Sequence, residues 1–276
     1  MIYPGSINIQ AFLDEDIGSG DITASIIPET RSAEAKVITR EAMLCCGQDW
    51  FNAVFSALNA AIQINWQVEE GEWVDADRVL CTLSGLARPL LTGERTALNL
   101  LQTLSATASL ARLYANAVTG TGCKVLDTRK TIPGLRDAQK YAVVCGGCHN
   151  HRIGLYDGIL IKENHIMAAG SIAQAIALAR KISDKLLEVE VESMAELEQA
   201  IAARPDRIML DNFSVPQLRM AVKKVAGRCE LEASGNIVLS NIREIAETGV
   251  DYISIGALTK SVLAVDLSMR IILEGE

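Results

Sequence analysis

Short hydrophobic runs recur along the second half of the chain, and a helical pattern separates each run from the next. They predict strands at KVLDT (124–128), DGILIK (157–162), LLEVEVES (186–193), DRIMLDN (206–212), CELEAS (229–234) and DYISIG (251–256). Strands that alternate with helices form βα units and a parallel sheet. The short spacing of the units favours an incomplete, roughly six-stranded α/β barrel, and an open doubly wound sheet is the alternative.

The segments between these runs carry helix signals. Apolar residues recur at helical spacing in 172–182, 194–201, 215–225 and 242–246. Ser193 and Glu196 have the spacing of a capping box, and Ser214 is placed to cap the next helix. Gly227 and Gly249 follow the last two patterns, where glycine commonly ends a helix. The second half therefore reads as a regular α/β domain.

The first part of the chain has a different pattern. Residues 33–40, 61–68 and 78–83 read as strands, and 48–60 and 93–118 read as helices. The second of these helices has no internal proline or glycine after its first residue, so it predicts one long element. We expect a smaller α/β domain over 1–105, which this helix joins to a barrel domain over 106–265.

The strand LLEVEVES carries an unusual set of charges. Glu188, Glu190 and Glu192 alternate with valines, so all three carboxylates face one side. Parallel strands are covered on both faces, and buried carboxylates are costly unless cations or a metal compensate them. Candidate cations stand at or after the first two strand ends: Arg129, Lys130, Arg152 and Lys162. A solvated edge strand is the structural alternative.

Polar side chains end nearly every predicted strand, and in a barrel these ends meet at one mouth. Basic groups there suit a substrate with carboxylates or phosphates, because arginine binds both in bidentate fashion. Carboxylates there suit ribose hydroxyls or Mg²⁺, which prefers oxygen ligands. The small loops 234–236 and 256–259 follow the last two strands, where barrels often bind phosphate.

Composition narrows the class of protein. The chain has 276 residues, 49% of them hydrophobic, with a net charge of −8 that argues against general nucleic-acid binding. No uncharged apolar run is long enough for a membrane span, and the opening MIYPGSINIQ shows no secretory pattern. Seven cysteines, an odd number, are typical of a reduced, cytoplasmic chain.

The stretch C-G-G-C-H-N-H at 145–151 has competing interpretations. Its first five residues spell the C-x-x-C-H signature of c-type haem attachment. Two thiols and two imidazoles so close together also resemble a zinc site. The position between the first and second barrel strands favours a third interpretation, a tight loop that turns at its glycines and delivers His151 and Arg152 to the mouth. A haem or zinc module is thus the alternative from another functional class.

Longer blocks resemble a known family. DTRKTIPGLRDAQKYAVVCGGCHNHRIGLYDGILIKENHI (127–166) is similar to the core signature of quinolinate phosphoribosyltransferases, also called carboxylating nicotinate-nucleotide pyrophosphorylases. The similarity continues in order through EDIGSGDITAS (15–25), GERTALNLL (93–101), EVEVES (188–193), IMLDNFS (208–214), LEASGNI (231–237) and TGVDYISIGALTKS (248–261). These blocks span most of the chain.

The resemblance implies an N-terminal α/β sandwich domain, an incomplete barrel, and a tail over 266–276 that returns to the first domain. It implies a cytoplasmic glycosyltransferase of NAD biosynthesis, which converts quinolinate and phosphoribosyl pyrophosphate to nicotinate mononucleotide, pyrophosphate and CO₂ with Mg²⁺. The family forms homodimers or larger assemblies with shared sites. A related phosphoribosyltransferase-like protein linked to molybdenum transport, of unsettled substrate, is the nearest alternative, and another phosphate-binding barrel, such as an isomerase, is more distant.

The resemblance also implies roles for individual residues. Arg95 would reach the quinolinate carboxylates of a neighbouring subunit, and Lys130, Glu190 and Asp211 are the catalytic candidates. Glu190 and Asp211 would also hold Mg²⁺, directly or through water. The substrate-binding candidates are Arg95, Thr128, Arg129, Lys130, His151, Arg152, Lys162, Glu190, Asp211, Ser234, Gly235, Asn236, Gly256, Ala257, Leu258, Thr259 and Lys260. Cys148 and Lys260 depart from the commoner glycine and histidine of the family.

Overall fold

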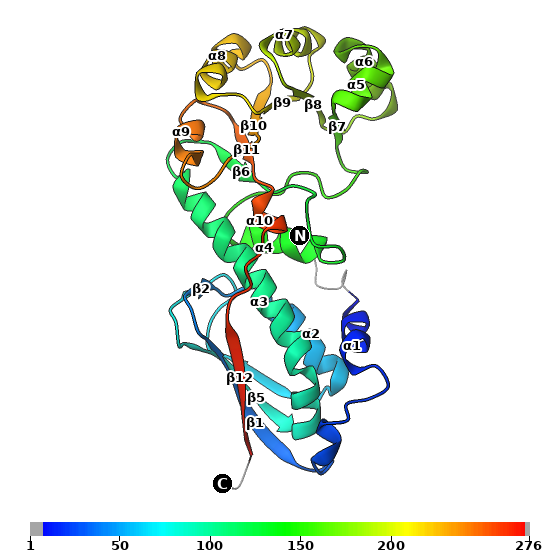
Figure 1. Ribbon diagram of the computed structural model, residues 1–276, viewed down its shortest axis with the longest axis vertical. Helices are drawn as coiled ribbons and strands as arrows, with labels where there is room; N and C mark the ends of the chain where they lie inside the picture. The colour runs from blue at the N-terminus through cyan, green and yellow to red at the C-terminus, as the bar shows by residue number, and fades with distance from the viewer. Residues whose placement is uncertain (1–7, 274–276) are drawn as a thin grey trace. The chain divides into compact units, whose positions relative to one another are not determined.

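The computed structural model describes residues 8–273, which form two compact units (Figure 1). Unit 1 contains the chain up to Ala111, Ile132–Gly147 and the chain from Ser261 onward. Unit 2 contains Arg112–Thr131 and Cys148–Lys260, so the helix α3 (Ala87–Ala117) begins in unit 1 and ends in unit 2. The expectation about a secretory leader falls partly on residues 1–7, and the end of the predicted returning tail falls on 274–276; both stretches lie outside the described residues.

Unit 1 is built on an antiparallel sheet with the strand order β12-β1-β5-β3. These strands are β1 (Ser32–Thr39), β3 (Gln63–Trp66), β5 (Val79–Leu86) and β12 (Leu267–Leu273). Buried and exposed residues alternate along the first half of β1, as expected for a sheet covered on one face. The tail strand β12 pairs with β1 along its whole length. It is the part of the predicted tail that the structure describes.

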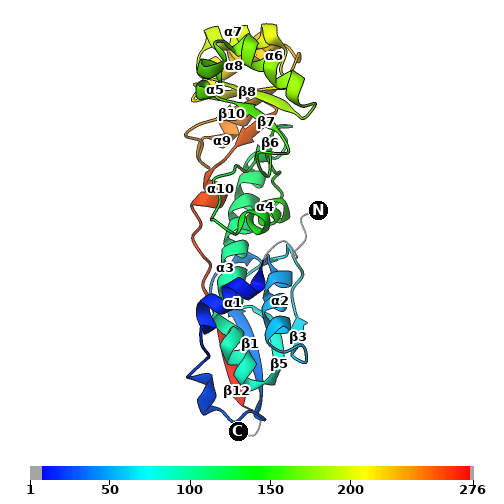
Figure 2. The ribbon, with the colours of Figure 1, turned by 90° about the vertical axis from the view of Figure 1, so that its right-hand side faces the viewer.

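Helices supply the other half of the unit 1 core. Trp50, Phe51 and Phe55 of α2 (Gln48–Leu58) are fully buried in one core cluster with leucines of α3 and of the sheet. Figure 2 shows the ribbons of α2 and α3 beside the strands β1 and β5. The remaining elements are α1 (Ile9–Ile17), η2 (Ala24–Ile26), β2 (Met43–Leu44), β4 (Trp73–Val74) and α4 (Arg136–Cys145). The helix α3 begins six residues before the predicted start, because Pro89 is accommodated in its first turn.

Unit 2 contains a parallel sheet of all six predicted strands. They are β6 (Lys124–Leu126), β7 (Ile159–Ile161), β8 (Leu187–Val191), β9 (Arg207–Asp211), β10 (Glu230–Ser234) and β11 (Tyr252–Ser254). The strand order is β6-β11-β10-β9-β8-β7, which is chain order around a ring that stays open between β6 and β7. A doubly wound sheet reverses its order at a switch point. The incomplete-barrel prediction is therefore confirmed, and its alternative is wrong.

The helices of unit 2 follow their strands in turn. They are α5 (Glu163–Ala169), α6 (Ile172–Ile182), α7 (Met194–Ala203), α8 (Val215–Val225), α9 (Ile242–Ala246) and α10 (Ala257–Lys260). Figure 1 shows α6, α7 and α8 along the outer side of the strands. Ser214 and Gln217 form the complete capping box of α8. The Ser193 side chain caps α7 by accepting the Glu196 N–H. The Glu196 carboxylate accepts the N–H of Glu192 in place of the Ser193 N–H, so the predicted capping box is only half formed.

The acidic strand β8 lies inside the sheet, because it pairs with β7 on one side and β9 on the other. The solvated-edge alternative for Glu188, Glu190 and Glu192 is therefore wrong. Burial along this face changes in steps from the fully buried Glu188, through the half-buried Glu190, to the exposed Glu192. The face runs from the barrel interior out to the mouth. No helix within residues 8–273 is long and apolar enough to cross a membrane.

Candidate active site

The segment that carries Arg152 is fastened to the first barrel strand. Residues 148–150 lie along β6, where the His149 N–H donates to Val125 O at 2.8 Å and the Asp127 N–H donates to His149 O at 3.0 Å. The buried Asp127 carboxylate then accepts the His151 N–H at 2.9 Å and the Asn150 side-chain amide at 2.6 Å. These hydrogen bonds hold Asn150, His151 and Arg152 beside β6, where the barrel is open between β6 and β7.

Two guanidinium groups face the same cavity at this place. Burial lowers the pKa of Arg152, and the positive charge of Arg129 lowers it further. The Nε of Arg129 is buried, and no described residue accepts a hydrogen bond from it. Two close positive charges and a buried unpaired donor are costly in a protein interior. An anionic ligand with more than one acceptor group would relieve both costs.

The cavity at the mouth of the barrel has a volume of about 450 Å³. Its lining combines basic, acidic, hydroxyl and apolar side chains: Thr128, Arg129, Lys130, His151, Arg152, Leu160, Lys162, Glu190, Met209, Asp211, Ser234 and Ser254. All six strands contribute lining residues, either from the strand itself or from the residues directly after it, and His151 and Arg152 come from the segment between α4 and β7. The sequence prediction that the strand ends form one mouth is confirmed.

The acidic side of the cavity lies at the ends of β8 and β9. Lys162 forms an ion pair with Glu190. Oxygen atoms of Glu190, Glu192 and Asp211 lie within 4.8 Å of one another, and a hydrogen bond and the negative charge of Glu163 raise the pKa of Glu192. Three clustered carboxylates are a donor set that suits a hard divalent cation.

We call the residues that line the cavity its rim. Two further carboxylates, Glu188 and Glu232, are buried beneath it. Desolvation raises the pKa of Glu188 to about 7 and that of Glu232 to about 8, and the negative charge of Glu188 contributes to the rise at Glu232. Arg207 compensates them, since its Nη1 lies 3.3 Å from a Glu232 oxygen and its guanidinium stacks 3.8 Å above the ring of Tyr252. The floor of the cavity is thus a buried charge network.

His151 connects this network to the arginines. The Arg152 N–H donates to its Nδ1 at 2.7 Å, so the ring proton resides on Nε2 and donates to Glu188 at 2.8 Å. Both nitrogens of the ring are therefore used within the protein. The ring lines the cavity, and its hydrogen bonds hold the backbone of Arg152 in place.

Glycines shape the two loops beside the cavity. Gly235 has φ of +96°, and a Cβ there would stand 2.2 Å from the Asn212 side-chain oxygen, so any other residue would displace the Asn212 side chain. At Gly256 a Cβ would stand 3.2 Å from Cδ of Lys130. The Thr259 hydroxyl donates to the Lys130 carbonyl at 2.9 Å, which ties helix α10 to the loop after β6.

Comparisons with known proteins agree with this arrangement. Residues 21–105 match the N-terminal domain of quinolinate phosphoribosyl transferase, and residues 107–270 match its C-terminal domain. The chain belongs to the quinolinate phosphoribosyltransferase family.

Relatives within the family align over nearly the whole chain. A probable carboxylating nicotinate-nucleotide pyrophosphorylase of Bacillus subtilis is 41% identical over 96% of this chain and 92% of its own. The Mycobacterium leprae nicotinate-nucleotide pyrophosphorylase is 40% identical, with 95% of each chain covered. The solved nicotinate-nucleotide pyrophosphorylase of Francisella tularensis is 49% identical, with a TM-score of 0.92 over 96% of this chain and 94% of its own.

The structure brings together most of the residues that this family resemblance proposes. Thr128, Arg129, Lys130, His151, Arg152, Lys162, Glu190, Asp211 and Ser234 line the cavity. The other candidates of unit 2 do not line it. Gly235 and Asn236 follow β10 and Gly256 precedes α10, while Ala257, Leu258, Thr259 and Lys260 form the short helix α10, where the sequence predicted a loop. Of these, Leu258 and Thr259 are buried. Arg95 belongs to unit 1, where it is exposed on α3.

Sequence reasoning missed Arg207 and the pairing of Glu188 with Glu232. The signal was present, since Arg207, Met209 and Asp211 alternate along β9 and therefore share the inward face with the glutamates of β8. Cys148 of the C-x-x-C-H motif is buried, and burial raises the pKa of its thiol to about 12. His151 groups with Glu188 and Glu232, and Cys145 groups with Cys46 and Glu70.

Proposed function

We propose that the chain transfers a phosphoribosyl group from phosphoribosyl pyrophosphate to quinolinate, giving nicotinate mononucleotide, pyrophosphate and CO₂ in NAD biosynthesis. The Bacillus subtilis and Mycobacterium leprae relatives are named as carboxylating nicotinate-nucleotide pyrophosphorylases, the first of them as a probable one. The observation that carries the proposal is the pair of arginines, Arg129 and Arg152, in one cavity with a buried unpaired Nε. Quinolinate is a pyridine with two adjacent carboxylates, which match the two guanidinium groups and offer acceptors for the unpaired Arg129 Nε.

The cavity also suits the second substrate. The half-buried carboxylates of Glu190 and Asp211 would accept hydrogen bonds from ribose hydroxyls and stabilise positive charge at the anomeric carbon as pyrophosphate departs. Lys130 and Lys162 would balance phosphate and carboxylate charge. Phosphate groups would lie at the loop 234–236 and at Gly256 with the helix α10 that follows it, where Gly235 and Gly256 leave little room for a side chain. Holding both substrates in line removes up to about 7–11 kcal/mol of entropic barrier.

Decarboxylation needs no separate group in this scheme. Once the ring nitrogen is bonded to ribose, the pyridinium ring is cationic and accepts the electron pair of the breaking C–C bond. The carboxylate leaves as CO₂, and a proton then replaces it on the ring. Arg129 and Arg152 would orient the two carboxylates, and no general base is required of the chain.

A magnesium ion fits the acidic side of the same cavity. Glu190, Glu192 and Asp211 offer carboxylate oxygens within 4.8 Å of one another, and Mg²⁺ prefers such ligands together with water. Glu190 and Asp211 would hold it, directly or through water. The ion would neutralise the departing pyrophosphate.

We further propose a homodimer or larger assembly in which Arg95 completes the site of a neighbouring subunit. Its exposed position on α3 is compatible with such a contact. Mixing an inactive Arg95→Ala chain with an inactive Lys162→Ala chain should restore about a quarter of the wild-type activity in random dimers, because one complete site forms in half of them. Lack of recovery after confirmed subunit exchange would place Arg95 outside the shared site. All seven cysteines occur as thiols, which fits a cytoplasmic location.

One assay tests the function itself. Purified chain incubated with quinolinate, phosphoribosyl pyrophosphate and Mg²⁺ should release CO₂ and nicotinate mononucleotide in equal amounts. Nicotinate, which lacks one carboxylate, should be a far poorer substrate because it leaves one arginine unpaired. A chain that binds phosphoribosyl pyrophosphate yet releases no CO₂ from quinolinate would favour the molybdenum-transport-linked relative. The near-complete match to named pyrophosphorylases does not favour that alternative.

A further inference from the structure

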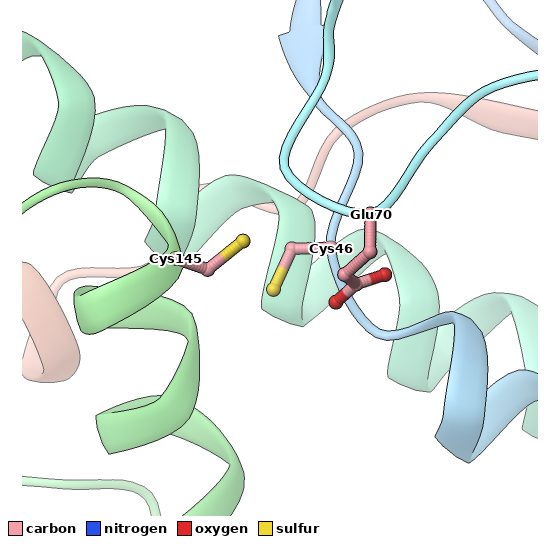
Figure 3. A group of neighbouring side chains, drawn as sticks. All are labelled: Cys46, Glu70 and Cys145. Atoms are coloured by element: carbon pink, nitrogen blue, oxygen red, sulfur yellow. The ribbon is translucent and has the colours of Figure 1, made fainter.

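Unit 1 contains a cluster of potential metal ligands that the proposed reaction does not use. Sulfur atoms of Cys46 and Cys145 and a carboxylate oxygen of Glu70 all lie within 4.8 Å of one another. Figure 3 shows the Cys46 sulfur between the Cys145 sulfur and the Glu70 carboxylate. Cys46 precedes α2, Glu70 lies in the turn between β3 and β4, and Cys145 ends α4. Three segments distant in sequence therefore converge on one point.

Two of these segments are fixed to each other by backbone hydrogen bonds. The Gly71 N–H donates to Cys45 O at 2.8 Å, and the Cys45 N–H donates to Glu72 O at 2.9 Å. The Glu70 carboxylate accepts the N–H groups of Gly47 at 2.8 Å and Gln48 at 3.1 Å, one on each oxygen. Each carboxylate oxygen has a second lone pair, so Glu70 remains able to bind a cation.

The third ligand approaches through a gap that a glycine leaves. Gly71 has φ of +84°, and a Cβ there would stand 3.3 Å from the Cys145 sulfur. Cys46 is fully buried, while Cys145 and Glu70 are half-buried. The cluster is thus dry at Cys46 and partly accessible to solvent at Cys145 and Glu70.

The electrostatics of the cluster favour a cation. Burial raises the pKa of the Cys46 thiol, and the neighbouring Cys145 and Glu70 raise it further. The Tyr141 hydroxyl hydrogen-bonds to Glu70, and negative groups and burial raise its pKa as well. In the buried Glu188–Glu232 group of unit 2, by contrast, Arg207 already supplies the positive charge. The cysteine cluster concentrates acidic groups in a half-apolar site, where a bound cation would deprotonate the thiols.

We propose that Cys46, Cys145 and Glu70 bind one divalent transition-metal ion of the zinc class, with water as the fourth ligand. Two thiolates and a carboxylate are borderline-soft donors that suit Zn²⁺ in tetrahedral geometry. Metal–ligand bonds of about 2.0–2.3 Å place neighbouring ligand atoms about 3.5–3.8 Å apart, so the cluster needs to contract by no more than about 1 Å. Binding releases one proton from each thiol.

The ion would fasten the end of α4 to the loop before α2. Its role is structural, because all three ligands belong to unit 1 and the substrate cavity belongs to unit 2. Binding to the folded chain alone stabilises it by mass action. Tyr141 acts as a positioning residue through Glu70, and loss of such an outer hydrogen bond weakens metal affinity about 10–100-fold.

Cobalt titration tests the site independently of enzymatic activity. The full chain, purified without a histidine tag, reduced and stripped of metal, is titrated with Co²⁺. We expect thiolate-to-cobalt charge-transfer absorption and the visible bands of tetrahedral Co²⁺, complete at about one ion per chain, and bleached by Zn²⁺. Cys46→Ser and Cys145→Ser should each lose this absorption. Cys229→Ser, which removes a half-buried thiol of unit 2, should keep it.

The controls keep each outcome decisive. Circular dichroism checks that the variants fold, and Cys145→Ser serves if the fully buried Cys46→Ser does not, because its side chain is partly exposed. Tyr141→Phe should bind Co²⁺ about tenfold more weakly with the same bands. A wild-type chain without thiolate bands, or bands that survive in a folded Cys145→Ser chain, would overturn the proposal.

Discussion

Glu188 and Glu190 leave the same face of the same strand, yet their surroundings differ completely. Glu188 is fully buried, accepts a hydrogen bond from His151 and shares a pair with Glu232 above Arg207. Glu190 is half-buried, lines the cavity and pairs with the exposed Lys162. Two residues along a barrel strand thus separate a sealed carboxylate from one that a ligand can reach.

The difference separates stability from function. The buried network cannot exchange partners without leaving a charge unpaired in a dry interior. The cavity-lining groups Arg129, Arg152 and Glu190 are partly exposed, and Arg129 keeps a buried Nε that no described residue accepts from. We therefore expect substitutions at the rim to affect turnover, and substitutions in the floor to affect folding.

The largest effect is expected at the rim. Arg152→Ala should lower kcat/KM for quinolinate by at least about 10²–10³-fold, as for loss of a preorganised charge-stabilising donor. The midpoint of thermal unfolding should hardly change. Within the described residues, the Arg152 side chain donates one hydrogen bond to the backbone, to Gly158 O at 3.2 Å. Lys181→Ala, an exposed change on α6, is the control. Wild-type activity in a folded Arg152→Ala chain would contradict the site assignment.

Substitutions in the buried charge network at the floor of the cavity should lower the free energy of unfolding. Above about pH 8, where both carboxyls of the Glu188–Glu232 pair are ionised, Arg207→Met leaves the pair without its cation. It should then cost about 3–5 kcal/mol of unfolding free energy, measured with denaturant. Arg180→Met is the matched control, because it breaks a half-exposed ion pair with Asp206 worth about 0–1 kcal/mol. Equal losses in the two variants would mean that depth in the barrel does not set the cost.

These contrasts also mark what the sequence could predict. The six barrel strands are apolar runs whose pattern reflects burial directly, so all six were found. The sequence pattern does not predict helix α4, because its buried face includes the polar residues Gln139 and Lys140, which interrupt the apolar periodicity. The rim residues follow from strand ends and from family blocks. Arg207 above Tyr252 and Cys46 beside Cys145 depend on contacts between distant segments, which a linear pattern does not encode.

The pH dependence of stability offers a finer distinction. The pKa values of Glu188, about 7, and Glu232, about 8, exceed their ordinary value of 4.5, so the folded chain binds more protons than the unfolded chain between these limits. The contribution of these two protonated carboxyls to the free energy of unfolding is greatest below about pH 4.5 and decreases as pH rises to about 8. Glu232→Gln should flatten the fall in thermal midpoint, whereas the exposed Glu198→Gln should follow the wild-type profile. Parallel profiles for Glu232→Gln and wild type would show that the pair does not hold its protons.

A glycine comparison should give the smallest effect. Gly227→Ala and Gly235→Ala both place a side chain at positive φ, which costs about 1 kcal/mol or more. Only at Gly235 does the new Cβ collide with Asn212. Gly235→Ala should therefore also raise KM for phosphoribosyl pyrophosphate several-fold, while Gly227→Ala leaves it unchanged. Identical kinetics in the two variants would remove the loop 234–236 from the phosphate site.

The most direct test of the rim as a dicarboxylate site is a crystal structure of the chain with quinolinate. We predict that the two carboxylates lie within hydrogen-bond distance of the Arg129 and Arg152 guanidinium groups, with Arg129 Nε donating to one of them. The Glu188–Glu232 pair should stay sealed beneath the ligand. Quinolinate bound outside this cavity, or in it without contact to either arginine, would contradict the account.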